Sequence, residues 1–136
     1  MIKYFVAYGM TAVTFFAIDF LWLSRIARSF YFERLGPLLL DKPNMLAAGI
    51  FYAVYVIGIV IFAVAPALRE NSTTTALMMG ALFGFFAYAT YDMTNIATLK
   101  NWSVAVTVVD IAWGTFLTGI SAMLGFLGTR LVLSLH

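Results

Sequence analysis

The segment Tyr88-Ala-Thr-Tyr-Asp-Met-Thr-Asn95 places an acid, Asp92, and an amide inside an apolar run that extends over about residues 75–98. Two further acids, Asp19 and Asp110, lie in apolar runs of similar character. The lengths of these runs decide the fold, because a helix crosses a bilayer only where it offers enough consecutive apolar residues. The three carboxyl groups inside the runs then indicate where a functional site would lie.

The composition of the chain excludes most soluble protein classes. Of its 136 residues, 63% are hydrophobic and 10% are charged, and the mean hydropathy is +0.97. In soluble domains about a quarter of the residues are charged. A chain of this length cannot bury so much apolar surface in its own core. The chain has no cysteine, and its one histidine is His136, which leaves little basis for a thiolate site, a histidine-ligated metal or a histidine base. The net charge of +2 does not indicate a nucleic-acid partner.

Four segments reach the length of about 20 apolar residues that a spanning helix needs. They cover about residues 4–23, 46–68, 75–98 and 104–127. Helices keep every backbone group paired in lipid, and the alternation of a membrane barrel is absent. The predicted fold is therefore an all-α membrane protein, a four-transmembrane-helix bundle that forms a single domain over 1–136. Because the later loops are short, we expect the second helix to pack against the third and the third against the fourth.

The longest loop, residues 24–44, follows the first helix and combines basic with aromatic side chains: Arg25, Arg28, Arg34, Lys42, Phe30, Tyr31 and Phe32. This composition is typical of an interfacial segment that lies on lipid headgroups. An anchoring loop is the simpler interpretation, and a lid over the site is the alternative. Five of the eight Lys and Arg residues lie on the side of the first and third loops. The excess of positive charge predicts that these loops are cytoplasmic.

Helix geometry places the three acids at a similar depth below one membrane face. At a rise of 1.5 Å per residue, Asp19 lies roughly 9 Å inside Arg25, Asp92 roughly 12 Å inside Lys100 and Asp110 roughly 10 Å inside Ser103. We therefore expect Asp92 to lie close to both Asp19 and Asp110. Tyr88 and Asn95 recur with Asp92 at helical spacing, so they share its face of the third helix.

Aromatic side chains accompany these acids, since Trp22 and Trp113 each follow an acid by three residues and Tyr91 adjoins Asp92. Acids at this depth are costly and normally face a bundle interior or a water-filled cavity. One interpretation is a hydrogen-bonded polar cluster that fixes the register of the helices. The other is a ligand-binding or proton-relay site made of the same residues: Asp19, Asp92, Asp110, Asn95, Trp22, Trp113, Tyr88 and Tyr91.

The leading functional hypothesis is the binding or transport of a small cationic or proton-coupled solute, because aromatic faces attract positive charge. The alternatives are a membrane enzyme that acts on a lipid by acid–base chemistry and a structural or assembly subunit of a membrane complex. The sequence leaves open whether the protein is an enzyme, and it assigns no catalytic residue. The expected partners are membrane lipids and, for a transporter of this size, further copies of the chain.

A metal site is the weakest of the hypotheses. Asp19, Asp92 and Asp110 would offer hard oxygen ligands to a divalent cation such as Mg²⁺, Ca²⁺ or Mn²⁺. Their spacing matches no known metal-binding signature, so no cofactor is expected.

Two runs of the sequence, Tyr91-Asp-Met-Thr-Asn-Ile-Ala-Thr-Leu-Lys-Asn-Trp102 and Val109-Asp-Ile-Ala-Trp-Gly114, resemble a bacterial family of membrane proteins, domain of unknown function 2177. The early run Asp19-Phe-Leu-Trp22 is similar to the first helix of that family. The resemblance covers essentially the whole chain. It implies four membrane helices, a bacterial origin and hence a multi-pass protein of the bacterial inner membrane, and it supplies no catalytic residues.

Overall fold

The computed structural model describes residues 1–40 and 42–134. All regular secondary structure in that part of the chain is helical. Four helical spans are long and apolar enough to cross a membrane: Ile2–Ile26, Met45–Glu70, Thr73–Thr98 and Val104–Leu133. The predicted all-α membrane fold is therefore confirmed. The fourth span continues past its predicted end at residue 127, and His136, the one histidine, lies outside the described residues.

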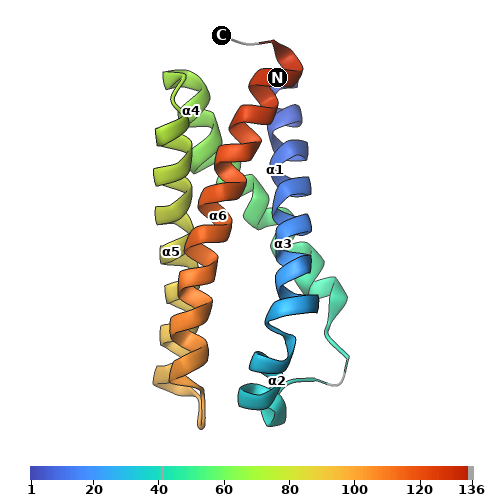
Figure 1. The fold of residues 1–136 in the computed structure, drawn as a ribbon, viewed down its shortest axis with the longest axis vertical. Helices are drawn as coiled ribbons and strands as arrows, with labels where there is room; N and C mark the ends of the chain where they lie inside the picture. Colours follow the sequence, from blue (N-terminus) through green and yellow to red (C-terminus); the bar gives the residue numbers. More distant parts are fainter. Residues whose placement is uncertain (41, 135–136) are drawn as a thin grey trace.

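The first span and its connection contain four elements. Helix α1 (Ile2–Leu21) passes into a π-helical turn, η1 (Trp22–Ile26). A short helix, α2 (Arg28–Leu35), follows at the end of the molecule opposite to the start of α1 (Figure 1). A 3₁₀ turn, η2 (Gly36–Leu38), then leads towards the second span. The predicted interfacial loop thus contains a helix.

The second span is assembled from helix α3 (Met45–Ile59), the π-helical turn η3 (Val60–Val64) and helix α4 (Ala65–Glu70). The third and fourth spans are single helices, α5 (Thr73–Thr98) and α6 (Val104–Leu133). The chain runs up and down, so the start of α1 and the end of α6 lie at the same end of the bundle (Figure 1).

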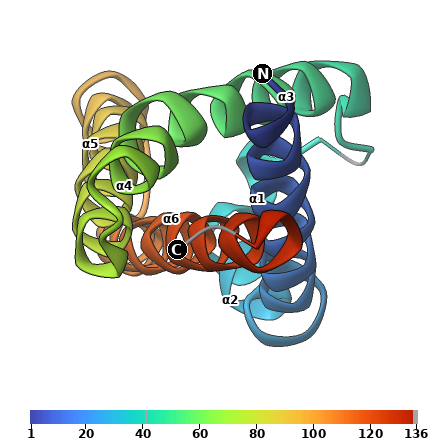
Figure 2. The same cartoon turned by 90° about the horizontal axis from the view of Figure 1, so that it is seen from above.

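Helix α6 is central to the packing, because its contacts with α5 and with α1 form the two largest interfaces. Figure 2 shows α1, α6 and α5 along three sides of the bundle, with the second span along the fourth. Along that side α3 meets α1, whereas η3 and α4 reach α5. The predicted neighbours, second with third and third with fourth, are confirmed.

Short polar side chains start three of the helices. The side chains of Asn44, Ser72 and Ser103 each accept a hydrogen bond from the backbone amide three residues further on, at 3.0, 3.1 and 3.1 Å. Such caps satisfy an amide that has no partner inside the helix, and each stabilises it by about 1 kcal/mol. They fix where α3, α5 and α6 begin.

Pro66 lies inside the second span and does not end it. A proline cannot donate to the carbonyl four residues earlier, and its ring clashes with that carbonyl. The wider turn η3 directly precedes Ala65 and Pro66, which provides the place where the regular ladder is interrupted. The span ends instead at Glu70, where Asn71 takes up a left-handed conformation with φ of 53°.

Helices α5 and α6 approach closely through glycines. A Cβ atom added to Gly80 would lie 2.7 Å from the Cβ of Ala122, and one added to Gly84 would lie 2.7 Å from the Oγ1 of Thr118. Gly80 and Gly84 thus form a Gly-x-x-x-Gly step that lets the two helices pack closely. Near the α2 end of the same interface, the ring of Tyr88 covers Gly114, where no side chain would fit.

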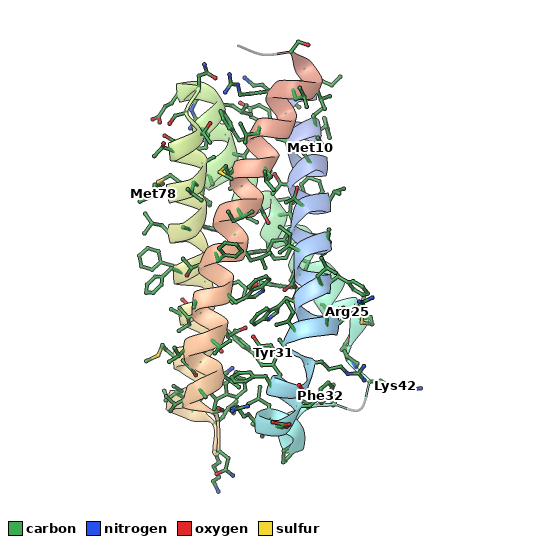
Figure 3. The ribbon with its side chains drawn as sticks, in the orientation of Figure 1. Met10, Arg25, Tyr31, Phe32, Lys42 and Met78 are labelled. Atoms are coloured by element: carbon green, nitrogen blue, oxygen red, sulfur yellow. The ribbon has the colours of Figure 1, made fainter. Side chains whose placement is uncertain are left out.

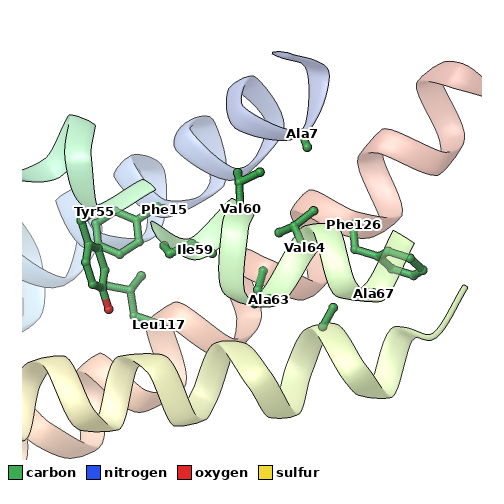
Figure 4. Packing of buried hydrophobic residues seen from close by; sticks show 12 residues of the cluster. Ala7, Phe15, Tyr55, Ile59, Val60, Ala63, Val64, Ala67, Leu117 and Phe126 are labelled. Atoms are coloured by element: carbon green, nitrogen blue, oxygen red, sulfur yellow. The ribbon is translucent and has the colours of Figure 1, made fainter. Parts of the chain in front are cut away.

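The core is apolar and the outer surface is apolar as well. Phe15, Ile59, Leu117 and Phe126 are fully buried between the four spans (Figure 4). Large apolar side chains also cover the outward faces of all four spans. Soluble monomers rarely expose contiguous apolar surfaces of this extent, so the outer surface fits a bilayer.

Candidate functional site

Helix α2 is joined to the membrane-spanning helix α6 by the side chain of one tyrosine. Tyr31 lies between α2 and α6 (Figure 3), and its hydroxyl donates a hydrogen bond of 2.9 Å to Oδ1 of Asp110. The same hydroxyl accepts a hydrogen bond of 3.4 Å from Nε1 of Trp22. Burial, reinforced by the negative charge of Asp110, raises the pKa of the Tyr31 hydroxyl well above its ordinary value. The hydroxyl therefore keeps its proton and acts as a donor at neutral pH.

Asp19 is held by donors from two other spans. It is 7% exposed. The Nε1 of Trp113 donates to one of its oxygens at 3.1 Å, and the hydroxyl of Tyr52 donates to the other at 3.5 Å. This carboxyl group thus joins α1, α3 and α6, which gives it a clear structural role.

The two tryptophans stack on each other. The rings of Trp22 and Trp113 lie 4.2 Å apart with an angle of 10° between their planes. Neither indole donates to the acid that precedes it by three residues. Trp113 donates to Asp19, and Trp22 donates to Tyr31. The donor that binds Asp19 therefore comes from a residue one helical turn beyond Asp110 along α6. That the three acids share one depth stays a prediction.

Asp92 is in the least satisfied position of the three acids. It is fully buried between α5 and α6, and neither of its carboxyl oxygens has a hydrogen-bond partner among the described residues. Its side chain lies close to that of Asp110, which lines the same cleft. Two ionised carboxyl groups at close range repel each other, and buried oxygens without donors are costly. A proton shared by the pair or a positively charged ligand would satisfy both conditions.

The expected close approach of Asp92 to both other acids is supported for Asp110 alone. Asp92 and Asp110 lie close together and line the same cleft. Asp19 lies within electrostatic range of Asp110, but its own oxygens are bound by Trp113 and Tyr52. The site divides into a carboxyl pair without sufficient donors and a separate acid that is already satisfied.

A cleft of about 790 Å³ lies beneath α2 and reaches the carboxyl pair. Asp92, Asp110 and Tyr31 form its polar part, and Arg28 also lines it. The remaining walls are mostly apolar or aromatic: Phe20, Leu23, Phe32, Leu35, Leu38, Leu39, Leu40, Pro43, Tyr91, Trp102 and Val106. Small-molecule sites are commonly of this size and character.

The remaining predicted site residues on α5 are less involved. Tyr91 lines the cleft but is 56% exposed, and its ring meets the edge of Trp102 at 5.8 Å. Tyr88 packs over Gly114. Asn95 lies beside Tyr91 and does not line the cleft. Shared helical spacing thus places these residues on one side of α5 but does not bring all of them to the same cavity.

The acids do not form a single metal-ligand set. Within residues 1–40 and 42–134, no three acidic or histidine side chains converge closely enough to hold one metal ion. Asp19 is separated from the pair because Trp113 and Tyr52 occupy its oxygens. The geometry therefore gives no support to a site in which Asp19, Asp92 and Asp110 bind one divalent cation.

Sequence reasoning did not assign Tyr31 or Trp102 to the site. Tyr31 is the middle residue of the aromatic run in the basic loop, and Trp102 ends the short loop before α6. Both signals are visible in the sequence. Their meaning depends on α2 folding back over the carboxyl pair, and the spacing of residues does not show this.

Comparison with known proteins identifies the family. Residues 4–127 match the family domain of unknown function 2177, described as a predicted membrane protein. The match covers most of the chain, so the protein belongs to this family, as the resemblance of its sequence motifs indicated. No curated protein and no solved structure showed significant similarity.

Proposed function

We propose that this member of the family binds a small amphipathic organic cation in the cleft beneath α2, with Asp92 and Asp110 as its counter-charges. The observation that carries the proposal is the state of Asp92. Its two oxygens are buried and have no donor among the described residues, and a second carboxyl group lies close to them. A cationic group placed between these side chains would supply the missing positive charge.

The walls of the cleft favour an organic cation over an inorganic one. Phe20, Tyr31 and Trp102 offer aromatic rings near the acids, and such rings attract cations that have lost part of their hydration. The apolar segment Leu38–Leu40 lines the same cleft and would contact hydrocarbon. A small hydrated metal ion would use neither of these features.

Helix α2 would act as the cover of the bound ligand. Tyr31 is hydrogen-bonded to Asp110, so a cation that pairs with Asp110 competes with this contact or shares the carboxyl group with it. Asp19 would position the site, because its bonds to Trp113 and Tyr52 hold three spans together around the Trp22–Trp113 stack.

Binding of tetraphenylphosphonium to the purified protein in detergent, measured by calorimetry, tests the proposal. We expect Asp92→Asn and Asp110→Asn each to weaken binding by at least about tenfold, since each removes a charge from a desolvated site. Glu70→Gln is the matched control, because Glu70 is an exposed acid at the other end of the second span. Unchanged binding in both aspartate variants, or equal binding of neutral triphenylphosphine oxide, would refute the proposal.

Transport of the cation is a further step of the same proposal. If the carboxyl pair shares a proton, binding of a cation releases it, and calorimetry in buffers of different ionisation enthalpy measures the number of protons released. Uptake of tetraphenylphosphonium into proteoliposomes under an imposed pH gradient then distinguishes a transporter from a binding protein. A transporter would show uptake that depends on the gradient and is lost in Asp92→Asn.

A second candidate is an enzyme that acts on a lipid by acid–base chemistry. The observation in its favour is that Arg28, a cation suited to a phosphate headgroup, lines the same mostly apolar cleft as the carboxyl pair. Two neighbouring carboxyl groups can divide the roles of acid and base. Comparison of the lipids of a deletion strain, a complemented strain and an Asp92→Asn strain tests it, and an unchanged lipid profile would count against it.

A further inference from the structure

An apolar groove opens on the outer surface of the bundle at the end opposite to α2. It lies between the beginning of α1 and the second span, and its volume is about 730 Å³. Figure 1 shows the start of α1 and helix α4 at this same end. The groove shares no residue with the cleft that contains Asp92 and Asp110.

The groove exists because the first two spans touch at one level and leave a gap nearer the membrane surface. The hydroxyl of Tyr8 donates a hydrogen bond of 3.2 Å to the backbone carbonyl of Ala53. Tyr8 and Ile57 line the inner part of the groove, and Arg69 lines its outer part. From Ile57 to Arg69 the second span rises by roughly 18 Å, at 1.5 Å per residue. The groove is therefore long and narrow, and it runs along the helices.

The turn η3 contributes to the shape of the groove. Val60 and Ile61, the first two residues of this π-helical turn, line its middle. Turns of this kind occur often at functional sites. Phe5 and Ala65 complete the apolar walls, so the part of a ligand that lies here must be hydrocarbon.

Arg69 gives the groove a charge at its outer end. It is exposed. It forms no ion pair among residues 1–40 and 42–134, where the one ion pair joins Arg34 to Glu33. The neighbouring Glu70 accepts a hydrogen bond of 2.7 Å from the hydroxyl of Thr75. Lys3 adds a second cation near this end, with its Nζ 5.4 Å from the centre of the Tyr4 ring.

We propose that this groove binds one anionic phospholipid, with an acyl chain along Val60 and Ile61 and its phosphate group at Arg69. An apolar slot that ends in a cation at the level of the headgroups matches the two parts of such a lipid. Arginine is well suited to bind phosphate through two parallel hydrogen bonds. The site is independent of the cation site proposed above.

Native mass spectrometry of the delipidated protein tests this assignment. We expect phosphatidylglycerol to bind at one site and phosphatidylcholine to bind about tenfold more weakly at the same concentration. Arg69→Gln should remove this preference, and Lys100→Gln, which changes a cation in the loop before α6, should preserve it. Ile61→Trp should fill the groove and prevent binding, whereas Phe62→Trp is its matched control, because Phe62 is equally exposed at 55% but lies outside the groove.

Three results would overturn the assignment. The first is equal binding of the two lipids to the wild-type protein. The second is unchanged binding in Ile61→Trp. The third is a dimer that the same spectra show to be lost in Ile61→Trp and kept in Phe62→Trp, because a second copy of the chain would then occupy the groove. Since both tryptophan substitutions affect exposed side chains, folding is expected to be retained, and equal melting temperatures of the two variants would confirm it.

Discussion

Tyr31 and Asp110 are 79 residues apart in the chain, yet the hydroxyl of one donates a 2.9 Å hydrogen bond to the carboxyl group of the other. This contact joins the interfacial helix α2 to the membrane-spanning helix α6. It places α2 over the carboxyl pair, an arrangement that supports the lid interpretation of the loop after the first helix, which stays a prediction.

Tyr31→Phe is expected to loosen α2 without changing the bundle. The substitution removes the donor to Asp110 and the acceptor for Trp22 while keeping the aromatic ring. A hydrogen bond to a charged group contributes about 1.5–3 kcal/mol, so opening of α2 should become at least about tenfold more frequent. Faster amide hydrogen exchange over residues 28–35 measures this change. Tyr91→Phe is the control, and similar exchange in both variants would contradict the prediction.

Asp92→Asn is expected to raise the melting temperature while it weakens ligand binding. The amide can donate to Asp110 and removes the repulsion between two acids, so it relieves the cost of buried oxygens that lack donors. The gain should be about 1–3 kcal/mol, the usual cost of an unsatisfied buried polar group. Thermal unfolding in detergent checks it. A lower melting temperature would show that Asp92 has a stabilising partner in the bundle.

Trp113→Phe is expected to lower the melting temperature, which is the opposite of the effect at Asp92. It removes the indole donor at 3.1 Å from Asp19 and weakens the stack on Trp22. Asp19 would keep only the 3.5 Å bond from Tyr52. The loss should be about 1–3 kcal/mol. Phe116→Leu, at an exposed position on the same helix, is the control. If the two variants melt alike, the bond to Asp19 does not hold the spans together.

Gly114→Ala is expected to force α5 and α6 apart. The added Cβ atom would collide with the ring of Tyr88, and inserting a methyl group into a packed interface typically costs about 1–3 kcal/mol. Gly9→Ala and Gly49→Ala are matched controls, because a Cβ at either position meets nothing within 4 Å. They should be neutral or stabilising, since alanine favours the helix by about 1 kcal/mol. The order of the three melting temperatures tests the prediction.

The four spans could be predicted because helix formation in lipid depends only on residues that are close together in the sequence. In a bilayer every backbone group must be paired within its own helix, so the length of an apolar run is sufficient to identify a span. The caps at Asn44, Ser72 and Ser103 are local as well. The effect of Pro66 is not predictable in this way, because it depends on whether the preceding turn can widen, and a single residue does not show this.

The carboxyl site was predictable only in part. The sequence identified Asp19, Asp92 and Asp110 as unusual, because acids inside apolar runs are costly wherever the helices lie. It paired each tryptophan with the acid of its own run, whereas the structure exchanges these partners between helices. It also treated the three acids as equivalent, whereas two donors satisfy Asp19 and none satisfies Asp92 among the described residues.

The sequence by itself determined that this chain spans a membrane four times and carries three acids within the spans, because apolar length and residue type act over a few consecutive residues. The tertiary structure decided which donor reaches which carboxyl group. That choice depends on how each helix is rotated and on how closely it approaches its neighbour. Contacts such as that between Gly114 and the ring of Tyr88 set both the rotation and the distance. It also decided that α2 lies over Asp110, because a connection through a turn such as η1 has a direction that its residue spacing does not specify.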